Sequence, residues 1–507
     1  MAESVSSSPT SPAVIPSEGV TKAERYLAKL CKRSFLSLWS YPGIYRDQGW
    51  PRKEVCDLLV VFENHIIIFS DKDCRFSDAT DLQLAWSRWF KKAVQKSAKQ
   101  VWGAERWIKQ FPNRLFLDRQ CSIPFPINLP DPAKATFHRI VVAHDASRAC
   151  QQRLGGSGSL MINSALVGDA HFGFLPFTIG ILDPNQGYVH VFDDTALNIV
   201  MSTLDTITDF TAYLTRKEQF LRGNRLIQAA GEEELLAVYL RDLNAAGEHD
   251  FVVNGDYDVL TFGEGLWDAF QRNPQRQAQI EADRISYSWD ALIEKFAFHA
   301  MTGTQYFTSG RPLRDQEEVF RFLARERRTQ RRILATSMHE VLERTLHSDS
   351  PLQARVMQPT ELNSPHYVFL FLHRKPGLSD QEYRNIRVRI LSEYCLVTKL
   401  KFPEAIHIVG IASEAGLPPQ RSEDFVYMNA SRWTAKDEAK AKQIQERFGF
   451  LRRVKREATR EYEYPIDDKG KRRGMPSRNS PCHCGSQKRF KNCHGKEFYR
   501  PKRGRKR

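Results

Sequence analysis

Three cysteines and a histidine near the C-terminus have the types and the spacing of metal ligands. One residue separates Cys482 from Cys484, and Cys493 and His494 follow after eight more. Structural Zn²⁺ prefers thiolates and imidazoles, and four such ligands complete its tetrahedral shell. Gly485 permits the tight turn that brings the first two sulfurs to one point. The pattern predicts a structural zinc site, and the alternative is a cluster of free cysteines in a tail without fixed structure.

The segment that carries these ligands, PCHCGSQKRFKNCHGK, resembles the SEC-C motif. This motif is the small zinc-binding tail of the SecA translocation ATPase, and many other bacterial proteins carry it. In SecA the module docks on a chaperone and on ribosomes, so the resemblance implies Zn²⁺ as a cofactor and a protein or a ribosome as a partner. The chain as a whole is not a SecA, because its sequence has no G-x-x-x-x-G-K-[ST] phosphate loop.

Positive charge is concentrated in the same part of the chain. The 507 residues carry a formal net charge of +15, and residues 451–507 hold 20 Lys and Arg against 6 Asp and Glu, a net +14. The preceding residues are therefore nearly neutral as a group. A basic tail attracts polyanions, so we expect it to bind nucleic acid, a ribonucleoprotein or an acidic protein surface. The alternative is a tail that only improves solubility.

A second set of candidate residues lies near the N-terminus and consists of Glu24, Asp57, Ser70, Lys72 and Gln95. Their order along the chain resembles that of PD-(D/E)xK nucleases, and this resemblance implies metal-dependent hydrolysis of a phosphodiester. Carboxylates hold Mg²⁺, which polarises the phosphodiester and activates a water. A lysine orients that water and neutralises the developing charge. Ordinary surface positions and structural ion pairs are the alternative for the same residues.

The elements that would position this second set follow from the hydrophobic periodicity. The pattern predicts a helix, three strands, a long helix and a further strand, at residues 21–33, 35–45, 57–62, 65–70, 83–110 and 137–143. Glu63-Asn64 is the turn that joins the second and third strands into a hairpin. Asp57 then opens one strand, and Ser70 ends the next.

This order of elements resembles the αβββαβ core of PD-(D/E)xK nucleases, which has a restriction-endonuclease-like fold. The family places an acid on the first helix, an Asp at the start of the second strand and a Lys or Gln on the following helix. The resemblance therefore implies catalytic or Mg²⁺-binding roles for Glu24, Asp57 and Gln95. It also implies a catalytic Lys72, because the third strand of the family carries [Glu/Asp]-x-Lys.

The chain departs from the family pattern at one position. Ser70 stands where the family has its acid, two residues before Lys72 and on the same face of the strand. Asp71 faces the other way, so Asp71 or Asp73 supplies a carboxylate only if the strand ends or bulges there. Glu63 is a weaker substitute. Two functions follow: a Mg²⁺-dependent nuclease with a degenerate acid position, or a non-enzymatic adaptor whose zinc tail docks on a partner.

For the whole chain we expect an α/β (α+β) protein of several parts. These are a disordered tail, a nuclease-like domain, a mainly helical region, a small α/β region, a charged helix end with a linker, and a SEC-C zinc knuckle, at residues 1–20, 21–200, 201–360, 361–450, 451–480 and 481–507. The N-terminus lacks the basic start and apolar run of a signal peptide. The longest apolar stretch, residues 58–69, is too short to span a membrane. We therefore expect a cytoplasmic protein of unspecified oligomeric state.

Two further groups of residues have functional types without a defining spacing. His144-Asp145 and His190 with Asp193-Asp194 are of the types that bind metals or exchange protons, but they lie too far apart in the sequence to define a site. Five arginines within residues 325–332 give one helix a basic face. We expect this face to be solvated, with nucleic-acid contact as the alternative.

Overall fold

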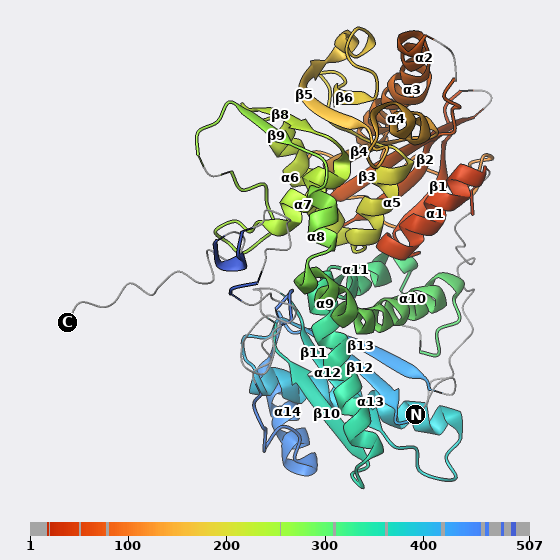
Figure 1. The fold of residues 1–507 in the computed structure, drawn as a ribbon. Helices are drawn as coiled ribbons and strands as arrows, with labels where there is room; N and C mark the ends of the chain where they lie inside the picture. The colour runs from red at the N-terminus through yellow and green to blue at the C-terminus, as the bar shows by residue number, and fades with distance from the viewer. Residues whose placement is uncertain are drawn as a thin grey trace. The chain divides into compact units, whose positions relative to one another are not determined.

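The structure of the chain is a computed structural model. It describes residues 18–19, 21–49, 52–77, 81–253, 255–307, 311–359, 364–416, 421–457, 462–465, 478–480 and 488–492. The chain divides into two compact units (Figure 1). The first comprises Met1–Glu281, Ala297–Glu317 and Tyr464–Arg507, and the second comprises Ala282–Phe296 and Glu318–Glu463. Helices and three mixed sheets build the described residues, which confirms a mixed α/β protein.

A five-stranded sheet forms the N-terminal part of the first unit. Its strands are, in spatial order, β1 (Ser40–Arg46), β2 (Lys53–Phe62), β3 (His65–Lys72), β4 (Thr136–Ala143) and β7 (Val189–Phe192). Antiparallel pairing joins β1 to β2 and β2 to β3, whereas β3, β4 and β7 run parallel. The predicted hairpin between β2 and β3 is confirmed, and Glu63 takes a positive φ of 51° in its turn.

Helices cover both faces of this sheet. Helix α1 (Lys22–Phe35) begins with a capping box, in which the Thr21 side chain and the Glu24 side chain each bind the other's backbone N–H. The Phe35 ring of α1 meets the Phe69 ring of β3. The long helix consists of α2 (Leu82–Trp89), the π-helical segment η1 (Phe90–Gln95) and α3 (Lys96–Gln110). Ser70, next to Phe69 and so on the opposite face, contacts α3.

A second sheet and several helices complete the described part of the first unit. The sheet has the order β6 (Thr178–Ile181), β5 (Met161–Val167), β8 (Leu226–Ala229) and β9 (Val259–Phe262). The helices that lie wholly in this unit after the long helix are α4 (Ala146–Leu154), η2 (Gly168–Phe172), α5 (Asp194–Thr203), α6 (Ile207–Leu221), α7 (Glu232–Arg241), α8 (Leu266–Gln271) and η4 (Phe490–Asn492). Helices α5 and α6 are separate, because the Thr206 side chain caps the start of α6.

The second unit is built on a four-stranded sheet. The strands, in spatial order, are β10 (Leu352–Met357), β11 (His366–Leu372), β12 (His407–Glu414) and β13 (Glu423–Asn429). Helix α13 (Asp380–Lys401) connects the parallel strands β11 and β12 and begins at a capping box of Ser379 and Glu382. Helix α14 (Ala435–Phe448) packs on α13 through the same apolar core. The opposite face of β11 packs on α12 (Arg328–Leu346).

Two of the arginines that the sequence places on a basic face lie inside the second unit. Arg331 and Arg332 are only 1 % and 3 % exposed. Arg331 pairs with Asp290 at 2.7 Å, and Arg332 pairs with Asp283 at 2.9 Å. The prediction of a solvated face is wrong for these two residues, because carboxylates on α9 (Pro274–Asp283) and α10 (Tyr287–Thr302) neutralise them. Helix α11 (Leu313–Ala324) and η3 (Arg284–Ser286) complete the described helices.

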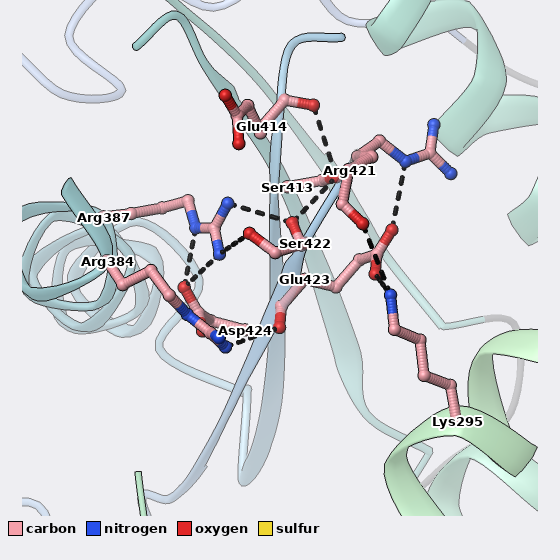
Figure 2. A network of polar contacts seen from close by, with 9 residues as sticks. All are labelled: Lys295, Arg384, Arg387, Ser413, Glu414, Arg421, Ser422, Glu423 and Asp424. Atoms are coloured by element: carbon pink, nitrogen blue, oxygen red, sulfur yellow. Dashed lines mark hydrogen bonds and ion pairs between the residues drawn. The ribbon is translucent and has the colours of Figure 1, made fainter. Parts of the chain in front are cut away.

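A buried ion pair ties α13 to the edge strand β13 (Figure 2). The Asp424 carboxylate accepts from Arg384 at 2.7 Å and from Arg387 at 2.6 Å. Arg387 also donates to the carbonyl and the hydroxyl of Ser422, at 2.9 and 3.0 Å. The Asp424 side chain is 2 % exposed and that of Arg387 is fully buried, so this network is part of the core of the second unit.

Candidate functional site at the end of the β2–β3 hairpin

Asp57, Ser70 and Gln100 lie together on one face of the N-terminal sheet. Leu58 pairs with Phe69, so the same antiparallel register puts Asp57 opposite Ser70, with both side chains on one face. The Ser70 hydroxyl donates to Gln100 Oε1 at 3.2 Å, and Gln100 Nε2 donates to Asp57 Oδ1 at 3.5 Å. The backbone N–H of Asp71 donates to Asp57 Oδ2 at 2.5 Å. Helix α3, through Gln100, and strand β3, through the Asp71 N–H, thus hold the Asp57 carboxylate beside Ser70.

Lys72 and two further carboxylates surround this group. Lys72 shares the face of Ser70, because the two residues are two apart on β3. Burial raises the pKa of Asp57, and the Asp71 N–H and the positive charge of Lys72 oppose that rise. The pKa of Glu54 is raised to about 7, first by loss of solvation and then by the negative charges of Asp57 and Glu24, while Lys72 opposes. Glu24, Asp57 and Lys72 therefore all act on the charge of Glu54, and Lys72 also acts on that of Asp57.

Glu54 is a member of this site that the sequence did not indicate. It keeps an exposed surface on β2, unlike Asp57, which is 6 % exposed. Because Glu54 is exposed, water screens part of its interaction with the other charges. Crowded carboxylates of this kind are stabilised by a bound cation.

The amide that reaches the site comes from Gln100. Gln95 ends the π-helical segment η1, and the structure describes no hydrogen bond from Gln95 to Asp57 or Ser70. Gln95 and Gln100 are five positions apart, which corresponds to roughly 140° around a helix, so the two amides point in different directions. A role for Gln95 stays a prediction, whereas Gln100 is a structural member of the site.

The suggested substitutes for the acid at position 70 lie elsewhere. Asp71 points to the opposite face of β3, where His144 Nε2 lies 2.6 Å from its Oδ1. Asp73 is exposed beyond the end of β3. Glu63 belongs to the turn at the other end of the hairpin, a full strand length from Ser70. None of these three carboxylates joins Asp57 on its face of the sheet.

His144 lies between two carboxylates at the carboxyl ends of the parallel strands. Its Nδ1 is 2.5 Å from Oδ1 of Asp194, which follows β7, and its Nε2 contacts Asp71 at the end of β3. Burial disfavours the charged imidazole, but the hydrogen bonds and charges of Asp194 and Asp71 outweigh burial and raise the pKa of His144 to about 10. His144 and Asp194, which the sequence separates too widely to connect, thus form one ion-paired chain with Asp71, which is buried at its Asp71 end and exposed at Asp194.

The described residues contain no group of three or more His, Cys, Asp or Glu side chains placed to hold a metal ion. Mg²⁺ does not need such a group, because it keeps several waters and is commonly bound by one or two carboxylates. Asp57 and Glu54 are chemically suited to that mode. The Ser70 hydroxyl is a weaker ligand than a carboxylate.

The four predicted zinc ligands, Cys482, Cys484, Cys493 and His494, lie outside the described residues. The described residues around them include Phe490, which is 2 % exposed. The Phe490 N–H donates to the Ser480 carbonyl at 2.8 Å, and the Lys491 N–H donates to the Arg478 carbonyl at 3.1 Å. Two backbone segments flanking the first cysteine pair are therefore joined side by side.

Comparisons with known proteins agree with the C-terminal motif. The sequence matches the SEC-C motif family over residues 478–496. Members of this motif family commonly bind zinc. No curated protein and no solved structure matched the chain. Within the part of the chain that the structure describes, no helix has the length and apolar character to cross a membrane.

Proposed function

We propose that this chain is a zinc-binding SEC-C protein whose N-terminal domain hydrolyses phosphodiester bonds of nucleic acid. The carrying observation is the gathering of Asp57, Ser70, Lys72 and Gln100 on one face at the end of the β2–β3 hairpin. The element order over α1–β4 and the parallel pairing of β3 with β4 support a nuclease-like core. The basic tail supports a polyanionic substrate.

Each residue has a role in this proposal. Asp57, assisted by Glu24, would hold Mg²⁺, which when bound would polarise the phosphate and lower the pKa of a water. Lys72 would orient the attacking water and stabilise the charge that develops on the phosphate oxygens. Gln100 fixes the Asp57 carboxylate from the side of α3. The tail, with one Zn²⁺ on Cys482, Cys484, Cys493 and His494, would recruit nucleic acid or a ribonucleoprotein.

The test of this function is cleavage of single- and double-stranded DNA and RNA by the purified full chain with Mg²⁺ or Mn²⁺. We expect cleavage that requires the metal and that falls by at least about a hundredfold in Asp57→Ala and in Lys72→Ala. Glu438→Gln, an exposed change in the other unit, is the control and should cleave like the parent. Cleavage that survives both alanine substitutions would refute the assignment of the catalytic site.

Ser70 favours a second candidate function, that of a non-enzymatic adaptor. A serine at the family's acid position weakens metal binding, and its hydroxyl is already engaged with Gln100. In this case the body binds a protein partner, and the zinc tail docks on a ribosome, a chaperone or another acidic surface. No cleavage in the assay above, together with partners that are lost when residues 478–507 are removed, would favour the adaptor over the nuclease.

A further inference from the structure

The proposed nuclease site lacks one carboxylate, and the fold of β2 offers a replacement. The inference below rests on the proposed function and concerns which residue completes its metal site. The position to be replaced faces α3, beside Asp57 and Lys72. A replacing side chain must lie on the same face of the sheet and near the same end of the hairpin.

A β-bulge in β2 changes which of its residues face this site. Along β1 and β2 the pairing runs from Ser40 with Val60 to Ile44 with Cys56, and then shifts to Tyr45 with Glu54. The shift inserts one extra residue, Val55, into β2. Without the bulge, Glu54 and Asp57 are three positions apart and face opposite sides. One extra residue inverts the alternation, so Glu54 falls on the face of Asp57.

The residues of β1 that pair with β2 show the same placement. Directly opposed residues of an antiparallel pair share a face, so Glu54 shares the face of Tyr45. Tyr45 is adjacent to Ile44, which shares a face with Cys56, the neighbour of Asp57. Tyr45, Glu54 and Asp57 therefore all lie on one side.

We propose that Glu54 takes over the metal-binding role that Ser70 cannot fill, so that Asp57 and Glu54 are the two protein carboxylates of a Mg²⁺ or Mn²⁺ site. Glu54 is exposed, so solvent, metal and substrate reach it directly. Two carboxylates with several waters satisfy the octahedral shell of Mg²⁺. Bulges are frequent next to active sites, where they redirect a side chain. Here the bulge turns an acid of β2 toward the face on which Ser70 of β3 lacks a carboxylate.

The test measures Mn²⁺ binding to the full chain, with electron paramagnetic resonance reporting the concentration of free Mn²⁺. It does not rely on activity. We expect the parent to bind Mn²⁺ and both Glu54→Gln and Asp57→Asn to raise the dissociation constant by at least about tenfold. Glu63→Gln removes the same kind of charge from the far end of the same hairpin and should bind like the parent. In the Glu54→Gln background, Ser70→Asp should restore binding, because it returns the carboxylate to the family position.

The outcomes separate this proposal from the proposed function. Parent-like Mn²⁺ affinity in Glu54→Gln, with loss in Asp57→Asn, would overturn the role of Glu54 and leave the nuclease standing. Absence of both Mn²⁺ binding and cleavage in the parent would overturn the nuclease and the role of Glu54 together. Thermal unfolding of Glu54→Gln without metal checks the fold, and we expect no loss of stability because Glu54 is exposed.

Discussion

At the scale of single residues, the raised pKa of His144 predicts how the stability of the protein depends on pH. The folded state raises the pKa of this imidazole from 6.5 to about 10, since hydrogen bonds and charges from Asp194 and Asp71 outweigh burial. A raised pKa means that the folded state binds the proton more tightly than the unfolded state. This stabilisation is complete below about pH 6.5 and is lost as the pH rises toward about 10.

We therefore expect His144→Gln to lower the free energy of unfolding by about 3 kcal/mol at pH 6. The difference between the parent and this variant should shrink as the pH rises to 10. Urea unfolding of both proteins between pH 6 and 10 measures it. His347→Gln, whose side chain is 81 % exposed, is the matched control and should show little difference at any pH. A His144→Gln difference that is constant with pH would contradict the buried charged imidazole.

The sequence predicted part of the candidate site at this scale. Ser70 and Lys72 could be placed on one face because the alternation along a short strand is reliable, and Asp57 could be placed at the start of its strand. The position of Glu54 could not be predicted, because the strand after it is apolar on both faces and carries no sign of the extra residue at Val55. The long helix carries both Gln95 and Gln100, and a regular helical periodicity did not select Gln100 because it does not indicate the π-helical segment.

At the scale of elements, Asp424 is expected to hold helix α13 on strand β13. Its carboxylate is the counterion of Arg384 and of the fully buried Arg387 (Figure 2). Asp424→Asn keeps the shape but leaves the buried guanidinium without its charge partner. We expect a loss of about 3 kcal/mol in the stability of the second unit, the usual cost of breaking a buried ion pair from one side.

Hydrogen exchange measured by mass spectrometry detects this loss in the right unit. Peptides from α13 and β13 should exchange faster in Asp424→Asn, whereas peptides from β2 and β3 should exchange as in the parent. Glu438→Gln removes an exposed partner of Lys442 on α14 and should change exchange little. Unchanged exchange in α13 after Asp424→Asn would show that the network is dispensable for docking the helix.

Helices and strands with strong local sequence signals could be predicted from the sequence. The burial of charged side chains could not. The capping box before α13 and the apolar runs of β2 and β3 mark their own positions in the sequence. Arg331 and Arg332 carry no local sign of being buried, because the carboxylates that neutralise them come from other helices. Ion pairing between distant elements is a property of the fold, which a helical charge pattern alone does not contain.

At the scale of the whole molecule, charge and candidate chemistry occupy different parts of the chain. Residues 451–507 hold a net +14 of the total +15, whereas the crowded carboxylates belong to the hairpin site near the N-terminus. A basic segment that attracts a polyanion raises its local concentration around the chain. This division suits either proposed function, because the tail would recruit the substrate of the nuclease, and in the adaptor the tail would itself dock on the partner.

The zinc motif of the tail predicts the metal content of the whole chain. A segment of this length buries too little apolar surface to fold alone, so Zn²⁺ binding should supply its folding free energy. We expect about one Zn²⁺ per full-length chain by elemental analysis, and almost none after Cys482→Ser with Cys484→Ser. Cys121→Ser, which changes a cysteine outside the motif, is the control and should keep the metal. Zinc retained by the double variant would reject these ligands. If the Phe490 amide of a reduced, zinc-free parent is still protected from hydrogen exchange, the metal is not the source of order in the tail.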